Sequence, residues 1–240
     1  MSSTPIVLIS GAARGLGLAS AERLAALGWC VHGVHRDAAG RQGLVDRLGE
    51  DQVHQADLSE TGAAEQVVNR VLARAGRLDG VVHAMGEFAS AVPSETSREL
   101  VQDLWRSNML SAVDFLDASR GALRASKGAA VFFGSAGLAG VRARQTTAAY
   151  IAAKTALLVW MKSAALEEAP HGVRVNMVSP GVIPHRDAAS ETSDPERLAR
   201  IPSGRGGKPE EVAAAVSWLL SSDASHVIGQ DLEVAGGWLL

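Results

Sequence analysis

Short apolar runs alternate with longer amphipathic runs along the whole chain. Several of the short runs contain no polar residue, as expected for strands that are covered by helices on both faces. This alternation is typical of repeated strand-helix-strand units, whose strands form a parallel sheet. We therefore expect an α/β fold, with a single doubly wound domain built on a seven-stranded parallel sheet and flanked by helices on both faces.

The pattern also predicts the approximate position of each element. Strands are predicted at 6–10, 30–35, 52–56, 80–84, 129–133, 174–179 and 231–234, and helices at 15–27, 61–75, 97–125, 147–168 and 209–221. Gly28 is expected to cap the first helix, and Pro209 lies in the first turn of the last one. Residues 182–207 lose the apolar periodicity, which after a strand end predicts a substrate lid within one domain of residues 1–240.

Composition excludes several classes of partner. The chain has 23 Lys plus Arg against 26 Asp plus Glu, a net charge of -3, and no basic block of the kind that binds nucleic acid. It shows neither a signal peptide nor an apolar stretch long enough to span a membrane, so we expect a cytoplasmic protein. The lone Cys30 is interpreted as a small buried hydrophobe, and no residues are assigned to a metal.

Three glycines lie where the first strand passes into the first helix: Gly11, Gly15 and Gly17. Glycine allows a sharp turn and close approach to a pyrophosphate, while the helix N-terminus presents N–H groups and a partial positive charge. An ordinary strand-to-helix turn is the alternative. The placement at the start of an Ala-rich helix favours a dinucleotide-binding Rossmann domain, with Arg14 and Leu16 of the same loop among the cofactor contacts.

The second strand ends at His35 and Arg36, where an acidic residue would bind the ribose hydroxyls of NAD. Arg14 adds a second cation near this corner, and two cations favour a 2′-phosphate. We therefore predict NADP(H), with NAD(H) as the second choice and simple surface solvation of either arginine as the alternative. Asp57 and Leu58 are assigned to the adenine; a capping role for Asp57 stays open.

Tyr150 and Lys154 are four residues apart in a predicted helix and therefore share one face. A tyrosine ionises near pH 10, and bringing its pKa to about 7 requires roughly 4 kcal/mol in favour of the phenolate. One unit charge about 4 Å away, at an effective dielectric near 20, supplies about that much. We therefore expect Lys154 to lower the pKa of Tyr150; a snorkelling surface pair is the alternative for the spacing alone.

With these residues in order, the chain resembles the short-chain dehydrogenase/reductase family over essentially its whole length. The matching positions are Gly11, Gly15, Gly17, Asp57, Gly86, Asn108, Ser135, Tyr150, Lys154, Pro180 and Gly181. The runs at 204–213, 229–230 and 236–238 look like the 3-oxoacyl-(acyl-carrier-protein) reductase branch. The resemblance also implies cofactor contacts at Ala84, Gly86, Pro180, Gly181 and Ile183, besides Tyr150 and Lys154.

The resemblance implies one role for each of four side chains. Tyr150 would protonate a carbonyl oxygen as hydride arrives, and Ser135 would hold that oxygen by a hydrogen bond. Lys154 would lower the pKa of the tyrosine and bind the nicotinamide ribose. Asn108 would hold a water molecule that links the lysine to solvent.

Some positions depart from the family's usual pattern. His83 stands where the family has an asparagine that steadies the central sheet, so the histidine takes over this role or the region is looser. His185 replaces a threonine that touches the cofactor carboxamide, and Ala235 replaces an aspartate in the C-terminal motif. The Ser-to-Tyr spacing is two residues longer than usual, which places Arg142 and Arg144 near the site entrance, either to attract an anion or as solvated loop residues.

The favoured function is an NADPH-dependent oxidoreductase that reduces a ketoacyl or polyketide-like ketone to an alcohol. A pteridine reductase-like enzyme is one alternative, because the His35-Arg36 pair resembles its cofactor motif, although Ser135 argues against it. A non-catalytic NADP(H)-binding module is another. The partner is expected to be a small-molecule carbonyl substrate, free or carrier-linked. Apolar residues on several sides of helices 105–125 and 150–168 predict a homodimer or homotetramer.

Overall fold

The computed structural model describes residues 4–140, 142–183 and 195–239. It contains one seven-stranded sheet in the order β3-β2-β1-β4-β5-β6-β7, and every neighbouring pair is parallel. The strands are β1 Ile6–Ser10, β2 Cys30–His35, β3 Val53–Gln55, β4 Gly80–His83, β5 Ala129–Phe133, β6 Arg174–Pro180 and β7 Asp231–Val234. The predicted doubly wound α/β domain is confirmed. The order reverses between β1 and β4, where such sheets bind ligands at the carboxyl ends of their strands.

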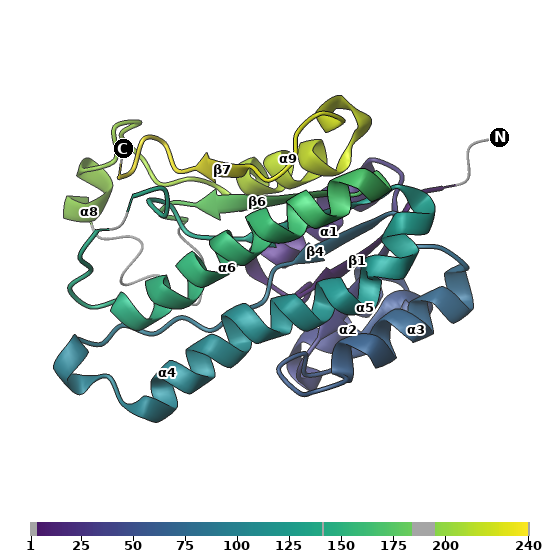
Figure 1. Ribbon diagram of the computed structural model, residues 1–240, viewed down its shortest axis with the longest axis horizontal. Coiled ribbons are helices and arrows are strands. Elements are labelled where there is room, and N and C mark those ends of the chain that lie inside the picture. Colours follow the sequence, from purple (N-terminus) through teal and green to yellow (C-terminus); the bar gives the residue numbers. More distant parts are fainter. Residues whose placement is uncertain (1–3, 141, 184–194, 240) are drawn as a thin grey trace.

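Helices cover both faces of this sheet. They are α1 Gly15–Ala26, α2 Arg41–Leu48, α3 Ala63–Ala75, α4 Arg98–Trp105, α5 Ser111–Ser126, α6 Ala148–Glu168, α8 Pro195–Ala199 and α9 Pro209–Leu220. Short 3-10 turns are η1 Ala38–Gly40, η2 Glu50–Gln52, η3 Pro93–Glu95, η5 Ala169–His171 and η7 Ser222–Ala224. In Figure 1, α4, α5 and α6 lie in front of the sheet, and the arrowheads of β6 and β7 point toward α8 and the C-terminus. The carboxyl ends of the strands therefore face that side of the molecule.

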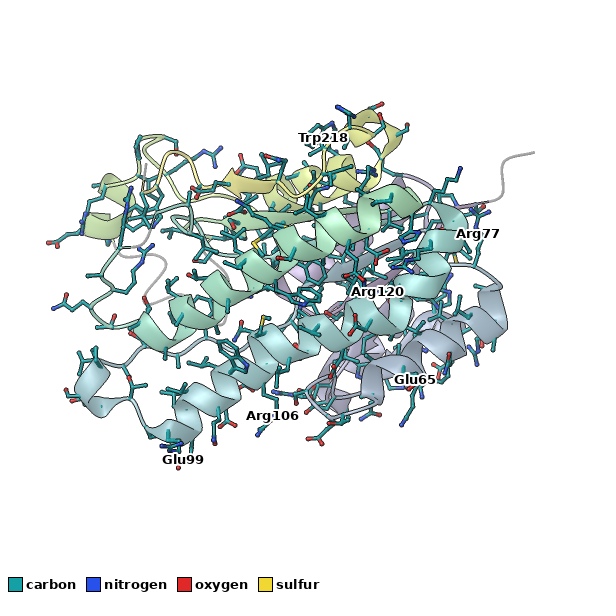
Figure 2. The ribbon with its side chains drawn as sticks, viewed as in Figure 1. Glu65, Arg77, Glu99, Arg106, Arg120 and Trp218 are labelled. Carbon is teal, nitrogen blue, oxygen red and sulfur yellow. The ribbon has the colours of Figure 1, made fainter. Side chains whose placement is uncertain are left out.

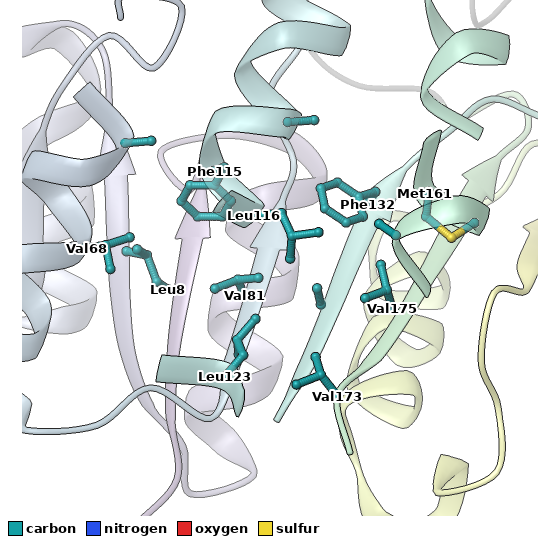
Figure 3. Packing of buried hydrophobic residues seen from close by; sticks show 14 of the residues in the cluster. Leu8, Val68, Val81, Phe115, Leu116, Leu123, Phe132, Met161, Val173 and Val175 are labelled. Carbon is teal, nitrogen blue, oxygen red and sulfur yellow. The ribbon is translucent and has the colours of Figure 1, made fainter. Parts of the chain in front are cut away.

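Successive strand residues enter two separate cores, because side chains alternate across a strand. Leu8 and Val81 belong to the cluster that packs against α3, α5 and α6, and Figure 3 shows Phe115 and Leu116 of α5 above them. Ile9, Val82 and their neighbours belong to the cluster under α1, α2 and α9. This two-sided burial explains the nearly uninterrupted apolar runs in the sequence.

The predicted helix at 97–125 is interrupted by the π-helix η4, Arg106–Leu110, which joins α4 to α5. Side-chain bonds accompany the wider turn: Asn108 Nδ2 donates to Leu104 O at 3.0 Å, and Ser111 Oγ donates to Ser107 O at 2.7 Å. π-segments within helices are frequent at functional sites. No periodicity signals this change of pitch, so sequence patterning missed it.

Other helices differ from the sequence prediction for local reasons. The sequence pattern missed α2, in which only Leu44 is buried, because one buried position gives little periodicity. It also missed the short α8 within the predicted lid. Helix α3 begins two residues later than predicted, because Gly62 adopts a φ of 81°. Gly28 with a φ of 84° and Pro209 lie at the helix ends as expected.

A buried ion cluster joins α5 to α6. The side chain of Glu168 is only 1% exposed and accepts two hydrogen bonds from Arg124, both at 2.8 Å. Arg120, which Figure 2 labels on α5 beside α6, also donates to Glu168.

The predicted lid is described only at 182–183 and 195–207. Within the described part of the chain, no helix has the length and apolar character needed to cross a membrane.

Candidate active site

A cavity of about 690 Å³ lies at the carboxyl ends of β5 and β6. It brings together four of the residues assigned from sequence: Ser135 after β5, Tyr150 in the first turn of α6, and Pro180 and Gly181 at the end of β6. The other lining residues are Phe88, Ser90, Ala136, Arg144, Thr146, Thr147, Ile151, Glu196, Arg200, Trp238 and Leu239. The cavity is therefore partly aromatic, with polar groups where the sequence predicts chemistry.

Tyr150 and Lys154 lie one turn apart on α6, and the Lys154 Nζ is 5.9 Å from the centroid of the Tyr150 ring. Burial raises the pKa of Tyr150 to about 12, and burial lowers the pKa of Lys154 to about 8. The predicted net fall in the pKa of Tyr150 is therefore not found in this structure, where burial dominates. Lys154 Nζ donates to Phe133 O at 2.8 Å.

Gly86 brings Asn108 close to Lys154. A Cβ at Gly86 would lie 2.3 Å from Asn108 Oδ1 and 3.4 Å from Lys154 Nζ, so only glycine fits here. Asn108 Nδ2 donates to Glu87 O at 2.9 Å as well as to Leu104 O. Asn108 Oδ1 is buried without a partner in the described structure. A buried unpaired amide oxygen marks a place where a water molecule or ligand supplies the missing donor.

His83 ends β4 and is fully buried beside this group. Its Nε2 lies 3.1 Å from Ser111 Oγ, and that hydroxyl donates to Ser107 O. Because the serine has one proton to give, His83 must donate from Nε2. Burial, together with the charge of Lys154, lowers the pKa of His83 to about 3. The neutral imidazole thus links β4 to the start of α5, a connection consistent with the steadying role considered for it.

The glycine loop packs closely against the end of β4. Gly11 has a φ of 64°, and a Cβ there would lie 2.8 Å from Ala84 O. A Cβ at Gly17 would lie 2.2 Å from Gly11 O. Leu16 packs against the second core, and the exposed Arg14 holds the N-cap position of α1. The loop therefore keeps its backbone against the end of β4 and passes directly into the N-terminus of α1, the kind of helix end that binds anions.

Of the two residues at the end of β2 that were assigned to the choice of cofactor, one is exposed and the other is buried. Arg36 is exposed and pairs with Glu87, with Nη1 3.0 Å from Oε1, and this bond raises the pKa of Arg36. His35 is buried, with Nδ1 2.7 Å from Asp37 O and Nε2 unpaired. The exposed arginine is thus the residue of this pair that can reach a phosphate.

Asp57 closes a local turn: its Oδ1 accepts from Ser59 N at 2.9 Å and from Ser59 Oγ at 2.6 Å. Burial opposes ionisation, but the bonds from Ser59 and the charge of Arg36 outweigh it and lower the pKa of Asp57. The side chain of Leu58 is buried in the first core. The carboxylate of Asp57 therefore closes a turn and does not cap α3, whose N-cap is Gly62, so the capping alternative is wrong.

The end of β6 lies against the serine loop and the C-terminal segment. Ala136 N donates to Pro180 O at 3.0 Å, and a Cβ at Gly181 would lie 2.8 Å from Ala235 Cβ. Ile183 is buried in the second core. His185 lies outside the described residues.

Sequence reasoning missed two neighbours of the residues assigned to the site. Phe88 packs edge-on against Tyr150, with ring centroids 5.1 Å apart. Glu87 pairs with Arg36, and its carbonyl accepts from Asn108. Both follow Gly86 directly after the carboxyl end of β4. Their position after a strand end is the sequence signal that could have assigned them to the site.

Comparison with known proteins shows the family to which the chain belongs. A family model described as enoyl-(acyl carrier protein) reductase matches residues 11–239, nearly the whole chain. The chain belongs to the short-chain dehydrogenase/reductase family. It is therefore an oxidoreductase that acts on CH–OH or C=O groups with a nicotinamide cofactor, as the sequence resemblance implied.

Relatives within this short-chain dehydrogenase/reductase family differ in their named activity. The 3-oxoacyl-[acyl-carrier-protein] reductase FabG of Escherichia coli is 33% identical over 237 residues, covering 97% of this chain and 96% of that protein. The L-fucose dehydrogenase of Mus musculus is 33% identical over 244 residues, covering 98% and 88%. A short-chain type dehydrogenase/reductase from Mycobacterium ulcerans superimposes with a TM-score of 0.92 at 28% identity, covering 100% of this chain and 91% of that one.

Proposed function

We propose that this enzyme reduces a ketone to an alcohol with NADPH, using Tyr150 as the general acid. The observation that carries the proposal is that Ser135 and Tyr150 line one cavity while Lys154 lies buried one turn along α6. The similarity to a 3-oxoacyl-[acyl-carrier-protein] reductase supports a ketoacyl or polyketide-like substrate, free or carrier-linked.

The residues at the glycine loop fit a dinucleotide. Side chains at Gly11, Gly17 or Gly86 would collide with the backbone or with Asn108, so only glycine allows this close packing at the carboxyl ends of β1 and β4, where such folds bind a dinucleotide. When bound, NADPH supplies the hydride. Arg36 and Arg14 support a preference for the 2′-phosphate of NADP(H) over NAD(H), because guanidinium groups bind phosphate strongly.

The side chains of this chain supply the proton and hold the substrate. With a pKa of about 12, Tyr150 keeps its proton at neutral pH and can donate it to the carbonyl oxygen. Ser135 can donate a hydrogen bond to the same oxygen, where negative charge develops. The charge of Lys154 then stabilises the phenolate that Tyr150 becomes, and Asn108 Oδ1 can hold a water molecule for proton return.

Substitution of Tyr150 by Phe tests the proposal. Tyr150→Phe should keep NADPH binding and lose nearly all NADPH oxidation with a carbonyl panel that includes acetoacetyl-N-acetylcysteamine and dihydropteridines. Ser135→Ala should lower kcat about a hundredfold or more, as the removal of one oxyanion donor does in other enzymes. Tight NADPH binding without wild-type turnover would instead favour the non-catalytic module, and turnover of dihydropteridines alone would favour the pteridine reductase.

Cofactor preference is tested by binding. The thermal midpoint of the wild type should rise more with NADP⁺ than with NAD⁺ at equal concentration, since a ligand stabilises in proportion to its affinity. Arg36→Gln should reduce the difference between the two cofactors. An equal shift with both cofactors would refute the preference.

We also propose one domain with a substrate lid at 182–207, and assembly into a homodimer or homotetramer. Apolar side chains on α6 are exposed in the single chain, with Val159 at 63% and Leu166 at 78%. Trp105 at the end of α4 and Leu110 in η4 are also exposed. Apolar patches of this kind are frequently covered by a partner.

A further inference from the structure

Arg144 lies on the wall of the cavity that also contains Ser135 and Tyr150. Its Nη2 donates to Gly137 O at 3.1 Å, whereas its Nε is buried without an acceptor. Among the residues that the structure describes, no carboxylate pairs with Arg144. A guanidinium in a partly enclosed site that lacks a counter-ion indicates that the ligand supplies one.

The described lining of the cavity carries two arginines and one carboxylate. Arg200 lines the same cavity, with its guanidinium carbon 5.9 Å from the centroid of the Trp238 ring. Glu196 also lines it but is exposed and engaged in another interaction. Glu233 Oε1 accepts from Gly137 N at 2.9 Å, on the other side of the residue that Arg144 binds. Glu233 is not part of the lining, so within the lining Arg144 and Arg200 stand against Glu196 alone, and an anionic ligand can pair with Arg144.

We propose that the substrate is a keto acid, a ketone with a carboxylate on the same molecule, and that Arg144 binds the carboxylate. The inference rests on the proposed function, which places the carbonyl at Ser135 and Tyr150. Phe88 and Trp238 supply apolar wall for the carbon chain between the two groups. Arginine suits this task because its planar fork matches the two oxygens of a carboxylate.

Arg142 provides a matched control in the same loop. Its Nη1 donates to Leu239 O at 2.9 Å, it is exposed, and it does not line the cavity. Arg142→Gln removes the same charge from the same loop as Arg144→Gln. A difference between the two variants therefore reports a contact in the cavity rather than a change in the overall field.

The experiment compares acids with their neutral esters. Purified full-length wild type, Arg144→Gln, Arg144→Lys and Arg142→Gln are assayed with NADPH on acetoacetate, levulinate and their methyl esters. The wild type should prefer the acids. Arg144→Gln should raise the KM for the acids about ten- to hundredfold, as loss of one charge-assisted bond does, with kcat and the ester kinetics little changed. Arg144→Lys should recover part of the loss, and Arg142→Gln should behave as wild type.

Two further assays accompany the variants. The first tests whether another anion takes the place of the carboxylate, and the second uses the wild type alone, so it does not require a variant to fold. Dihydroxyacetone phosphate against dihydroxyacetone tests a phosphate in place of the carboxylate, and a preference confined to the phosphate would overturn the keto-acid proposal. On the wild type alone, butyrate should inhibit competitively against the ketone more strongly than butyramide does.

Several results separate this inference from the proposed function. Reduction of the methyl esters or of acetoacetyl-N-acetylcysteamine with no preference for acids would overturn the keto-acid inference and leave the ketone reductase standing. Equal losses in Arg144→Gln and Arg142→Gln would also overturn it. No NADPH oxidation with any of these compounds would reject the proposed function itself, and the inference with it.

Discussion

Arg36 Nη1 lies 3.0 Å from Glu87 Oε1, so the arginine at the end of β2 is paired with a carboxylate that follows β4. The strands flank β1 from opposite sides, and the pair therefore crosses the carboxyl end of the first strand. Both side chains are about half exposed, 55% and 53%, which limits such a pair to about 1 kcal/mol or less. In the proposed complex with NADPH, the 2′-phosphate would compete with Glu87 for the same guanidinium.

Glu87→Gln should therefore tighten NADP⁺ binding by up to about fivefold and leave NAD⁺ binding unchanged, because it removes the competing carboxylate. Fluorescence titration of the two cofactors measures this. In the Arg36→Gln background, the same Glu87 change should have no effect. Equal tightening of NAD⁺ and NADP⁺ would show that Glu87 acts on the shared part of the cofactor instead.

Asn108→Ala should destabilise the fold by about 1–3 kcal/mol, since the carbonyl of Glu87 and the buried carbonyl of Leu104 each lose a donor. The ketone reductase rate should also fall, because Asn108 Oδ1 no longer faces the site beside Gly86. Urea unfolding measures the loss of stability. Asn69→Ala, at an exposed position on α3, is the control and should change neither quantity.

The rate of reduction should fall as pH rises through about 8, the value to which burial lowers the pKa of Lys154. Below that pH the ammonium stabilises the phenolate left by proton transfer; above it this charge is lost. Lys154→Met should be slow at every pH and lack this inflection. The pH profile of kcat/KM checks the prediction, and an inflection unchanged in Lys154→Met would assign it to another group.

Stability should fall in acid. Burial lowers the pKa of His83 to about 3, and burial with the charge of His32 lowers that of His54 to about 4. The unfolded chain binds these protons near pH 6.5, so stability is complete above that pH and is lost as pH falls from 6.5 through about 4 and 3. Urea midpoints at several pH values measure the loss. His83→Asn should weaken the dependence, and an unchanged slope would contradict this assignment.

The wild type should have a mass at least twice that of the 25.0 kDa chain in light scattering after size exclusion. Val159 and Leu166 lie seven residues apart, on one face of α6, and both are exposed. Leu166→Glu should shift the mass toward the monomer, because an interface buries charge at a cost. Glu65→Gln on α3 serves as a surface control. A clean wild-type monomer would refute assembly.

The parallel sheet and the cofactor loop were predictable because each leaves a local signal. Uninterrupted apolar runs such as 129–133 reflect burial on both sheet faces, and Gly11 needs a positive φ that few other residues adopt. Helix α2 and the π-helix at Arg106–Leu110 left no comparable signal. The first buries a single leucine, and the second depends on the bonds of Asn108 with residues 4 and 21 positions away.

The sequence by itself determined the order of strands and helices, the glycine cradle and the one-turn spacing of Tyr150 and Lys154, because these depend on neighbouring residues and on helix and strand periodicity. Only the tertiary structure decided the electrostatic environment. Burial, which the linear chain does not display, raises the pKa of Tyr150 where proximity to Lys154 predicted the opposite. Likewise, the pairing of Arg36 with Glu87 and the place of Arg144 in the cavity wall depend on which distant segments fold together.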